Sequence, residues 1–259
     1  MKEFLKQIVT RAGEISLEYR ARLSEVKVSQ KDTVKDLVTE ADVAVETYLI
    51  EQIENTYPEH AICAEESGTH AGGEYRWVID PIDGTTSFVH GHPFYSVSIA
   101  LQQGNDTILA AVFAPVLGEL YMAEKGKGAT RNDQPIAVSD RTALSDCLMT
   151  TGFACLRSNL KRNNLALIER IAPKLRGLRI LGSAAVDLCY VASGRTDGGW
   201  ELNLNIYDIA AGALIVQEAG GTVTDFSGNT TNLPHEILAT NGKIHNELSD
   251  LLMNKKQET

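Results

Sequence analysis

Short apolar segments alternate with compact turn sequences between residues 95 and 131, and this pattern limits the possible folds more than any other feature. Strand-like runs cover residues 95–102, 107–114, 119–123 and 128–131. The sequences GND at 104–106 and VLG at 116–118 separate the middle runs, as hairpin turns do. The middle of the chain is therefore predicted to form a mostly antiparallel sheet.

Two amphipathic helices are predicted before this sheet. Apolar residues recur at helical spacing from Leu5 to Tyr19 and again from Ala41 to Ile53. Thr39 is followed three residues later by Asp42, which is the spacing of a capping box at the start of the second helix.

After residue 148 strand-like and helical segments alternate. The expected strands are 148–151, 178–181, 198–202, 222–225 and 236–239, and the expected helices are 159–171, 183–192, 208–219 and one from 243. Alternation of this kind favours layered α/β packing. We expect an N-terminal α+β subdomain, residues 1–145, and a C-terminal α/β subdomain, residues 146–259, that share one cleft.

Composition limits the partners and the location of the protein. The chain has 259 residues, 43% of them hydrophobic, so it can bury a sizeable core, and no apolar run approaches the roughly 20 residues of a membrane-spanning helix. The net charge of −10 disfavours nucleic acid or an anionic membrane as the main partner. The N-terminus lacks a signal-peptide pattern, and the four cysteines have no zinc spacing. Reduced thiols in the cytoplasm are expected.

Residues 77–88, WVIDPIDGTTSF, carry the strongest chemical signal. An apolar strand leads into Asp80 and Asp83, and carboxylate oxygens are ligands that Mg²⁺ prefers, together with water and substrate phosphate oxygens. The turn at 84–86 would offer backbone N–H groups and a hydroxyl to a phosphate if a helix begins there. The alternative is an ordinary loop, because Asp, Pro and Gly are common turn residues.

Three further acidic segments bear on this choice. Glu65 lies in EESG at 65–68 after a short apolar strand, Asp42 ends DLVTEAD, and Asp208 lies in YDIAAG. Each alone also fits a solvated charge or a carboxylate at a helix N-terminus.

Taken together, these segments resemble the signature blocks of the inositol monophosphatase family. The blocks are DLVTEAD at 36–42, EES at 65–67, WVIDPIDGTT at 77–86, and DIAAG at 208–212 with EAGG at 218–221. They occur in the family's order and span nearly the whole chain. The resemblance implies an α/β (α+β) fold, the layered αβαβα sandwich of the inositol monophosphatase and fructose-1,6-bisphosphatase type. It also implies a lithium-sensitive, Mg²⁺-dependent phosphomonoesterase, with two or three Mg²⁺ per subunit, that forms a homodimer.

The resemblance also assigns roles to residues. The implied metal ligands are Glu65, Asp80, Asp83, Asp208 and the backbone carbonyl of Ile82. Thr85 and Asp42 match the pair that orients and deprotonates the attacking water. The implied substrate-binding residues are Gly84, Thr85, Ser183, Ala184 and Glu201. A lone Glu at a strand end is otherwise more often solvated.

Inositol 1-phosphate is the default substrate of such a site. Histidinol phosphate, fructose 1,6-bisphosphate and a nucleotide 3′-phosphate are alternatives with the same chemistry, and a non-catalytic interaction protein on the same fold is an alternative from another class. Tyr207 stands where many family members have Trp, and Asn203 and Asn205 leave the substrate wall undetermined.

Two groups of basic residues lie outside the acidic blocks. His90 and His92 are expected to be polar residues near the site rather than ligands of a transition metal. Arg157, Lys161 and Arg162 are expected to form a solvated helix face, with a dimer contact as the alternative.

Overall fold

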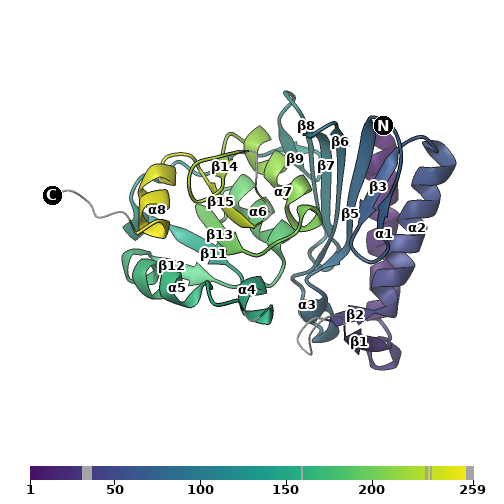
Figure 1. The fold of residues 1–259 in the computed structure, drawn as a ribbon, viewed down its shortest axis with the longest axis horizontal. Coiled ribbons are helices and arrows are strands. Elements are labelled where there is room, and N and C mark those ends of the chain that lie inside the picture. The colour runs from purple at the N-terminus through teal and green to yellow at the C-terminus, as the bar shows by residue number, and fades with distance from the viewer. Residues whose placement is uncertain (31–36, 159, 231–232, 234, 255–259) are drawn as a thin grey trace.

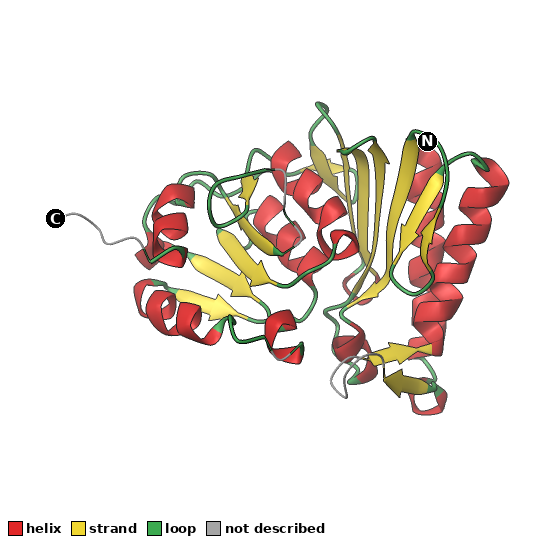
Figure 2. Ribbon diagram, in the orientation of Figure 1, coloured by secondary structure: helices red, strands yellow, loops and turns green. Residues whose placement is uncertain are grey.

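The chain folds into alternating layers of helices and sheets. The computed structural model describes all residues except 31–36, 159, 231–232, 234 and 255–259 (Figure 1). Helices α1 and α2 lie outside a large sheet, α6 and α7 fill the space between the two sheets, and α5 and α8 cover the far side of the second sheet (Figures 1 and 2). This arrangement confirms the predicted αβαβα sandwich.

The helices have apolar faces that pack on the sheets. They are α1 (Lys2–Arg20), α2 (Glu40–Thr56), α3 (Thr85–Val89), α4 (Ala154–Arg157), α5 (Leu165–Ile171), α6 (Ala184–Ala192), α7 (Ile206–Glu218) and α8 (His245–Leu252). Both α6 and α7 are buried over most of their length because they lie between two sheets. Among the described residues, no helix combines the length and apolar character needed to cross a membrane.

The large sheet has eight strands and is mostly antiparallel, as predicted. Its order is β10 (Gln134–Pro135), β9 (Ala129–Arg131), β8 (Glu119–Glu124), β7 (Asp106–Ala114), β6 (Ser96–Gln103), β5 (Tyr75–Asp83), β3 (Ala61–Ala64) and β4 (Gly68–His70). Strands β3 and β5 run parallel. The register of β5 against β6 shifts between Asp80 and Asp83. The strand therefore becomes irregular where the two aspartates occur.

The second sheet has five strands and comes from the C-terminal part of the chain. Its order is β12 (Gly177–Arg179), β11 (Leu148–Thr151), β13 (Gly198–Leu202), β15 (Glu236–Thr240) and β14 (Thr222–Thr224). Strand β11 is parallel to β12 and β13, whereas β15 is antiparallel to β13 and β14. A separate two-stranded ribbon, β1 (Val28–Gln30) with β2 (Leu37–Thr39), precedes α2.

The predicted capping box at α2 is confirmed. The Thr39 side chain accepts hydrogen bonds from the backbone N–H groups of Ala41 and Asp42, and Asp42 Oδ2 accepts from the backbone N–H of Thr39 at 2.8 Å. These bonds satisfy donors at the helix start that would otherwise be unpaired. Asp36, at the start of the DLVTEAD segment, lies outside the described residues.

The helix predicted over residues 159–171 is present and ends at Ile171 as predicted, but its predicted start is wrong. Asn159 lies outside the described residues, and α5 begins only at Leu165. Asn163 Oδ1 accepts from the backbone N–H of Leu165, while Asn164 is buried and its Nδ2 donates to Thr151 Oγ1 at 3.1 Å. Asparagine side chains that bind backbone and distant groups in this way compete with helix formation.

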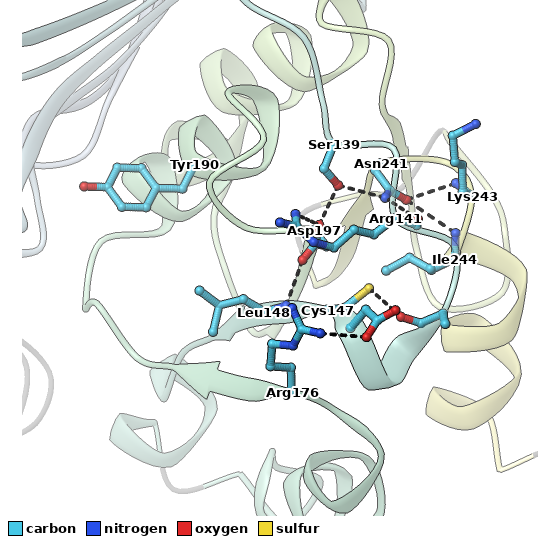
Figure 3. A network of polar contacts seen from close by, with 12 residues as sticks. Ser139, Arg141, Cys147, Leu148, Arg176, Tyr190, Asp197, Asn241, Lys243 and Ile244 are labelled. Atoms are coloured by element: carbon cyan, nitrogen blue, oxygen red, sulfur yellow. Dashed lines mark hydrogen bonds and ion pairs between the residues drawn. The ribbon is translucent and has the colours of Figure 1, made fainter.

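A buried aspartate fastens the segment that joins the two sheets. Asp197, before β13, accepts hydrogen bonds from Ser139 Oγ, Arg141 Nη1 and the backbone N–H of Leu148 (Figure 3). Asn241 Nδ2 donates to Ser139 Oγ at 3.0 Å and to the Arg141 carbonyl at 2.8 Å. This network joins residues on either side of position 145. It therefore holds the segment around residues 139–141 against the second sheet.

Candidate metal and phosphate site

A cleft of about 510 Å³ opens where the end of β5 faces the starts of α6 and α7. All the residues implied as metal ligands line it: Glu65, Asp80, Ile82, Asp83 and Asp208. Gly84, Thr85, Ala184 and Glu201 line it too. The fold therefore brings together residues that are distant in the sequence.

Three carboxylates form the centre of the cleft. Oxygen atoms of Asp80, Asp83 and Asp208 all lie within 4.8 Å of one another. Asp80 and Asp83 come from the irregular end of β5, and Asp208 is the third residue of α7, where its Oδ2 accepts from the backbone N–H of Asn205 at 2.5 Å. Helix α7 thus begins two residues earlier than predicted, with Asn205 as its N-cap.

Asp83 is fixed by the start of α6. Its Oδ2 accepts from Ser183 Oγ at 2.5 Å and from the backbone N–H of Ala185 at 2.7 Å, and its Oδ1 accepts from the backbone N–H of Ala184 at 3.3 Å. The Ser183 hydroxyl, for which substrate binding was expected, is therefore directed at a carboxylate of the cluster in this structure.

The cluster is electrostatically unfavourable without a cation. Burial, followed by the negative charges of Glu65 and Asp83, raises the pKa of Asp80 well above its ordinary value. Burial and the charge of Asp83 do the same to the pKa of Asp208. Burial raises the pKa of Asp83 to about 6, although the bonds from Ser183 and Ala185 act in the opposite direction. A bound cation would reverse these shifts.

The donor set fits a hard divalent cation such as Mg²⁺. Every candidate ligand is an oxygen, and Asp80 Oδ1 is buried without a hydrogen-bond partner among the described residues. Thr85 Oγ1 lies 3.2 Å from the carbonyl of Ile82 but has only one proton to donate, so when that proton goes to Asp42 the carbonyl lone pairs are available to an ion.

Thr85 and Asp42 meet at the edge of this cluster. Thr85 Oγ1 lies 3.3 Å from Asp42 Oδ1, and Asp42 Oδ2 also accepts from Thr39 Oγ1 at 2.5 Å. Asp42 is fully buried, so its carboxylate is held by donors on both oxygens rather than by water. The sequence-predicted pair is therefore in contact.

Gly84 makes the turn from β5 into α3 possible. Its φ of 95° lies in the left-handed region, and a Cβ there would lie 2.9 Å from the carbonyl oxygen of Gly182 and 3.1 Å from that of Phe94. Any other residue would be strained and crowded at this position. The backbone can therefore turn sharply from β5 into α3 at the place where Gly84 and Thr85 line the cleft.

Sequence reasoning missed one buried residue that supports the Glu65 loop. Glu46 on α2 is 3% exposed, and its carboxylate accepts from the backbone N–H of Glu66 at 2.9 Å and of Ser67 at 2.8 Å. It lies one helical turn after Asp42, so its position on the same helix face was the available signal.

Glu201 lies at the opposite wall of the cleft, at the end of β13. Its side chain packs so closely on Gly152 that a Cβ at that glycine would lie 2.0 Å from Glu201 Oε2. Burial and then the charge of Asp83 raise the pKa of Glu201 to about 8, while Arg157 acts in the opposite direction. Glu201 is therefore buried in the wall and is not a solvated strand-end acid.

Of two basic residues in the cleft, His90 lies near the site as predicted, whereas Arg157 does not lie where it was expected. Arg157, for which a solvated helix face was expected, lines the cleft from α4, and His90 lines it from the end of α3. Asn203 and Asn205 do not line the cleft: Asn203 Nδ2 donates to Ser158 Oγ at 3.0 Å, and Asn205 caps α7. These positions followed from chain packing rather than from any sequence pattern.

The raised pKa of Glu201 predicts that the metal-free protein loses stability as pH rises. The neutral form of Glu201 adds to the free energy of unfolding in full at a pH below 4.5, the ordinary pKa of a Glu side chain. This contribution is lost as pH rises through about 8, the pKa of Glu201 in the folded protein. The Tm of chelator-treated protein should therefore fall between about pH 5 and about pH 8. Glu201→Gln should reduce this slope, and Glu51→Gln, on the exposed face of α2, should leave it as in the wild type. An unchanged slope in Glu201→Gln would contradict the assignment.

Comparison with known proteins gives the family. The model of the inositol monophosphatase family matches residues 1–258. The chain is 46% identical over 237 residues to a putative Nus factor SuhB of Neisseria meningitidis serogroup B, covering 90% of each chain. It is 38% identical over 247 residues to a fructose-1,6-bisphosphatase/inositol-1-monophosphatase of Thermotoga maritima, covering 95% of this chain and 93% of the relative.

A solved structure agrees with the fold. The inositol monophosphatase of Anabaena (Nostoc) superposes with a TM-score of 0.88 at 37% identity, over 98% of this chain and 95% of that chain. The whole-length family match, the shared fold and the acidic cleft lead to one conclusion: this chain belongs to the inositol monophosphatase family.

Proposed function

We propose that this protein is a Mg²⁺-dependent phosphomonoesterase that hydrolyses small phosphorylated polyols, with inositol 1-phosphate as its main substrate. The observation that carries the proposal is the convergence of Asp80, Asp83 and Asp208 within 4.8 Å beside the Thr85–Asp42 contact. This arrangement combines a cation site with a group that can remove a proton from water.

Glu65, the three clustered aspartates and the Ile82 carbonyl would hold the ions. Mg²⁺ bound there would supply Lewis-acid polarisation of the phosphate and would lower the pKa of water. The family resemblance gives the number of ions as two or three. Ser183 and the amides of α6 keep Asp83 in place for this role.

The residues of the chain position water and move its proton. The water donates to Thr85 Oγ1 while the Thr85 hydroxyl donates to Asp42, so a proton can pass to Asp42 as the water oxygen attacks phosphorus. The ester P–O bond breaks with its electron pair on the leaving oxygen, which takes up a proton from solvent water, and Asp42 afterwards releases its proton to solvent. The products are the free alcohol and inorganic phosphate. Backbone N–H groups of Gly84 and Thr85 would orient the phosphate oxygens.

Glu201 supports a polyol as the leaving group. Its carboxyl group lines the cleft, where it can accept hydrogen bonds from sugar hydroxyls. An acidic side chain at this wall, neutral or ionised, offers no positive charge to a second anionic group on the substrate, which favours inositol monophosphates.

Arg157 supports a second candidate substrate, a sugar bisphosphate. A guanidinium group can bind a phosphate through two parallel N–H···O hydrogen bonds, and Arg157 lines the same cleft. The Thermotoga relative named for both activities makes fructose 1,6-bisphosphate the first bisphosphate to test.

A panel of substrates separates these candidates. We expect kcat/KM to be highest for inositol 1-phosphate among inositol 1-phosphate, histidinol phosphate, fructose 1,6-bisphosphate and adenosine 3′,5′-bisphosphate. Above about pH 8, where Glu201 is ionised, Glu201→Gln should lower the inositol 1-phosphate value by about tenfold or more, because a charged hydrogen bond is weakened. Arg157→Gln should lower the value for fructose 1,6-bisphosphate more than that for inositol 1-phosphate. A higher kcat/KM for another substrate, or an unchanged value in Glu201→Gln, would contradict the assignment of a polyol substrate. The assignment as a phosphatase would be unaffected.

The similarity to a protein named as a putative Nus factor supports a second role in protein interaction. This role does not require loss of catalysis, because every implied ligand and Thr85 are present in the sequence. The homodimer, the cytoplasmic location and the division near residue 145 remain proposals that rest on the sequence and on the family resemblance.

A further inference from the structure

A second, much smaller cavity lies behind the wall of the cleft, between α6 and the five-stranded sheet. Its volume is about 20 Å³, and its polar lining includes Thr150, Asp187 and Glu201. Ala184, Glu201 and Leu204 line both this cavity and the cleft, so Glu201 separates the two spaces. One water molecule needs roughly 10–15 Å³ on this measure, so the cavity has room for one.

Asp187 is the unexplained group in this cavity. It is 5% exposed, and neither of its carboxyl oxygens has a hydrogen-bond partner in the described part of the chain. A buried carboxyl group without partners is costly in free energy, and an ionised one is far more costly. Burial and then the charge of Glu201 raise the pKa of Asp187 well above its ordinary value. Burial without partners therefore favours the neutral form of Asp187, which has one O–H to donate.

We propose that a single water molecule in this cavity links Asp187 to Glu201, and that Asp187 thereby fixes the orientation of Glu201 toward the substrate. The Asp187 hydroxyl donates to the water, and the water donates to one oxygen of Glu201. The other Glu201 oxygen remains free to accept from a hydroxyl of the substrate in the cleft. Asp187 is a positioning residue in this arrangement, and its effect on substrate selection rests on the proposed polyol phosphatase function.

A water fits the cavity better than a metal ion does. Leu188, Val191 and Ile237 form much of the lining, so too few oxygens are present for the six or more ligands of a hard cation. A water needs only two to four polar partners, which Asp187, Glu201 and Thr150 supply.

Kinetics with two substrates test the positioning role. Inositol 1-phosphate offers hydroxyls to Glu201, whereas phenyl phosphate offers none. In Asp187→Leu, we expect the ratio of kcat/KM for inositol 1-phosphate to that for phenyl phosphate to fall about tenfold. Combining Asp187→Leu with Glu201→Gln should lower the ratio no further than Glu201→Gln alone, because both changes remove the same interaction. Asp187→Asn keeps an N–H donor for the water and should restore the ratio to near the wild-type value.

Equal losses with both substrates, or additive effects in the double variant, would overturn the positioning role and indicate a structural one. A high-resolution crystal structure gives a test that does not depend on the substrate. We expect density for one water bonded to both Asp187 and Glu201 in the wild type, and a displaced Glu201 side chain in Asp187→Leu. A dry cavity, or an unmoved Glu201, would overturn the proposal. If the wild type hydrolyses neither substrate, the proposed function fails and the crystal structures still decide this inference.

Discussion

Chelation of divalent cations is expected to abolish phosphate-ester hydrolysis by this protein, and excess Mg²⁺ is expected to restore it. Three carboxylates within 4.8 Å would repel a phosphate dianion, so the cleft can bind substrate only when cations reverse its field. Lewis-acid stabilisation contributes several kcal/mol to such reactions, so the loss should be at least about 10³-fold.

The measurement is the initial rate of inositol 1-phosphate hydrolysis during titration with EDTA and then with MgCl₂. Circular dichroism at each point shows whether the fold persists. The same titration is made with Asp208→Asn. This variant should need a higher Mg²⁺ concentration than the wild type for half-maximal rate, because an amide oxygen carries no charge. Full activity in excess chelator would rule out the cation-dependent mechanism.

Replacement of Thr85 by alanine is expected to lower kcat by about 10²- to 10⁴-fold, with little change in Mg²⁺ affinity. The Thr85 hydroxyl lies between the proposed water and Asp42, so its loss removes the proton path while the carboxylate ligands remain. Thr85→Ser keeps the hydroxyl and should recover most of the rate.

Asp83→Asn is the contrasting variant. It should weaken Mg²⁺ binding and lower the rate together, because Asp83 belongs to the carboxylate cluster. Steady-state kinetics at several Mg²⁺ concentrations separate the two patterns. Wild-type turnover by Thr85→Ala would show that another group activates the water.

The Thr85→Ala protein also separates catalysis from interaction. Thr85 is at the base of the cleft rather than on an outer face, so its replacement should leave the outer surface intact. An interaction role that survives in this variant would be independent of hydrolysis.

Local patterns in the sequence predicted most of the fold. The hairpins of residues 95–131, the capping box at Thr39 and the helix capped by Ser183 depend on neighbours within a few residues, so their signals are readable in the chain itself. The strands that were missed, β1, β2, β4 and β10, have two or three residues each and leave no clear periodicity.

The boundaries of the second half were less predictable because distant residues set them. Helix α5 is shorter than predicted because the Asn164 side chain donates a hydrogen bond to Thr151 on β11. Helix α7 begins at Ile206 because Asn205 and Asp208 form its cap. Such competition between helix propensity and side-chain bonds is decided by the packing of the whole molecule.

The sequence by itself grouped Asp80, Asp83 and Thr85 at one strand end, and its resemblance to the family led to the proposal that they hold a cation and activate water. Only the tertiary structure decided what surrounds them. Packing of α6 between the two sheets buries Asp187 beside Glu201. The pKa of a carboxyl group depends on its burial and on its neighbours, which the sequence does not show. Contacts between residues so far apart in the chain leave no local pattern, so they appear only when the layers are assembled.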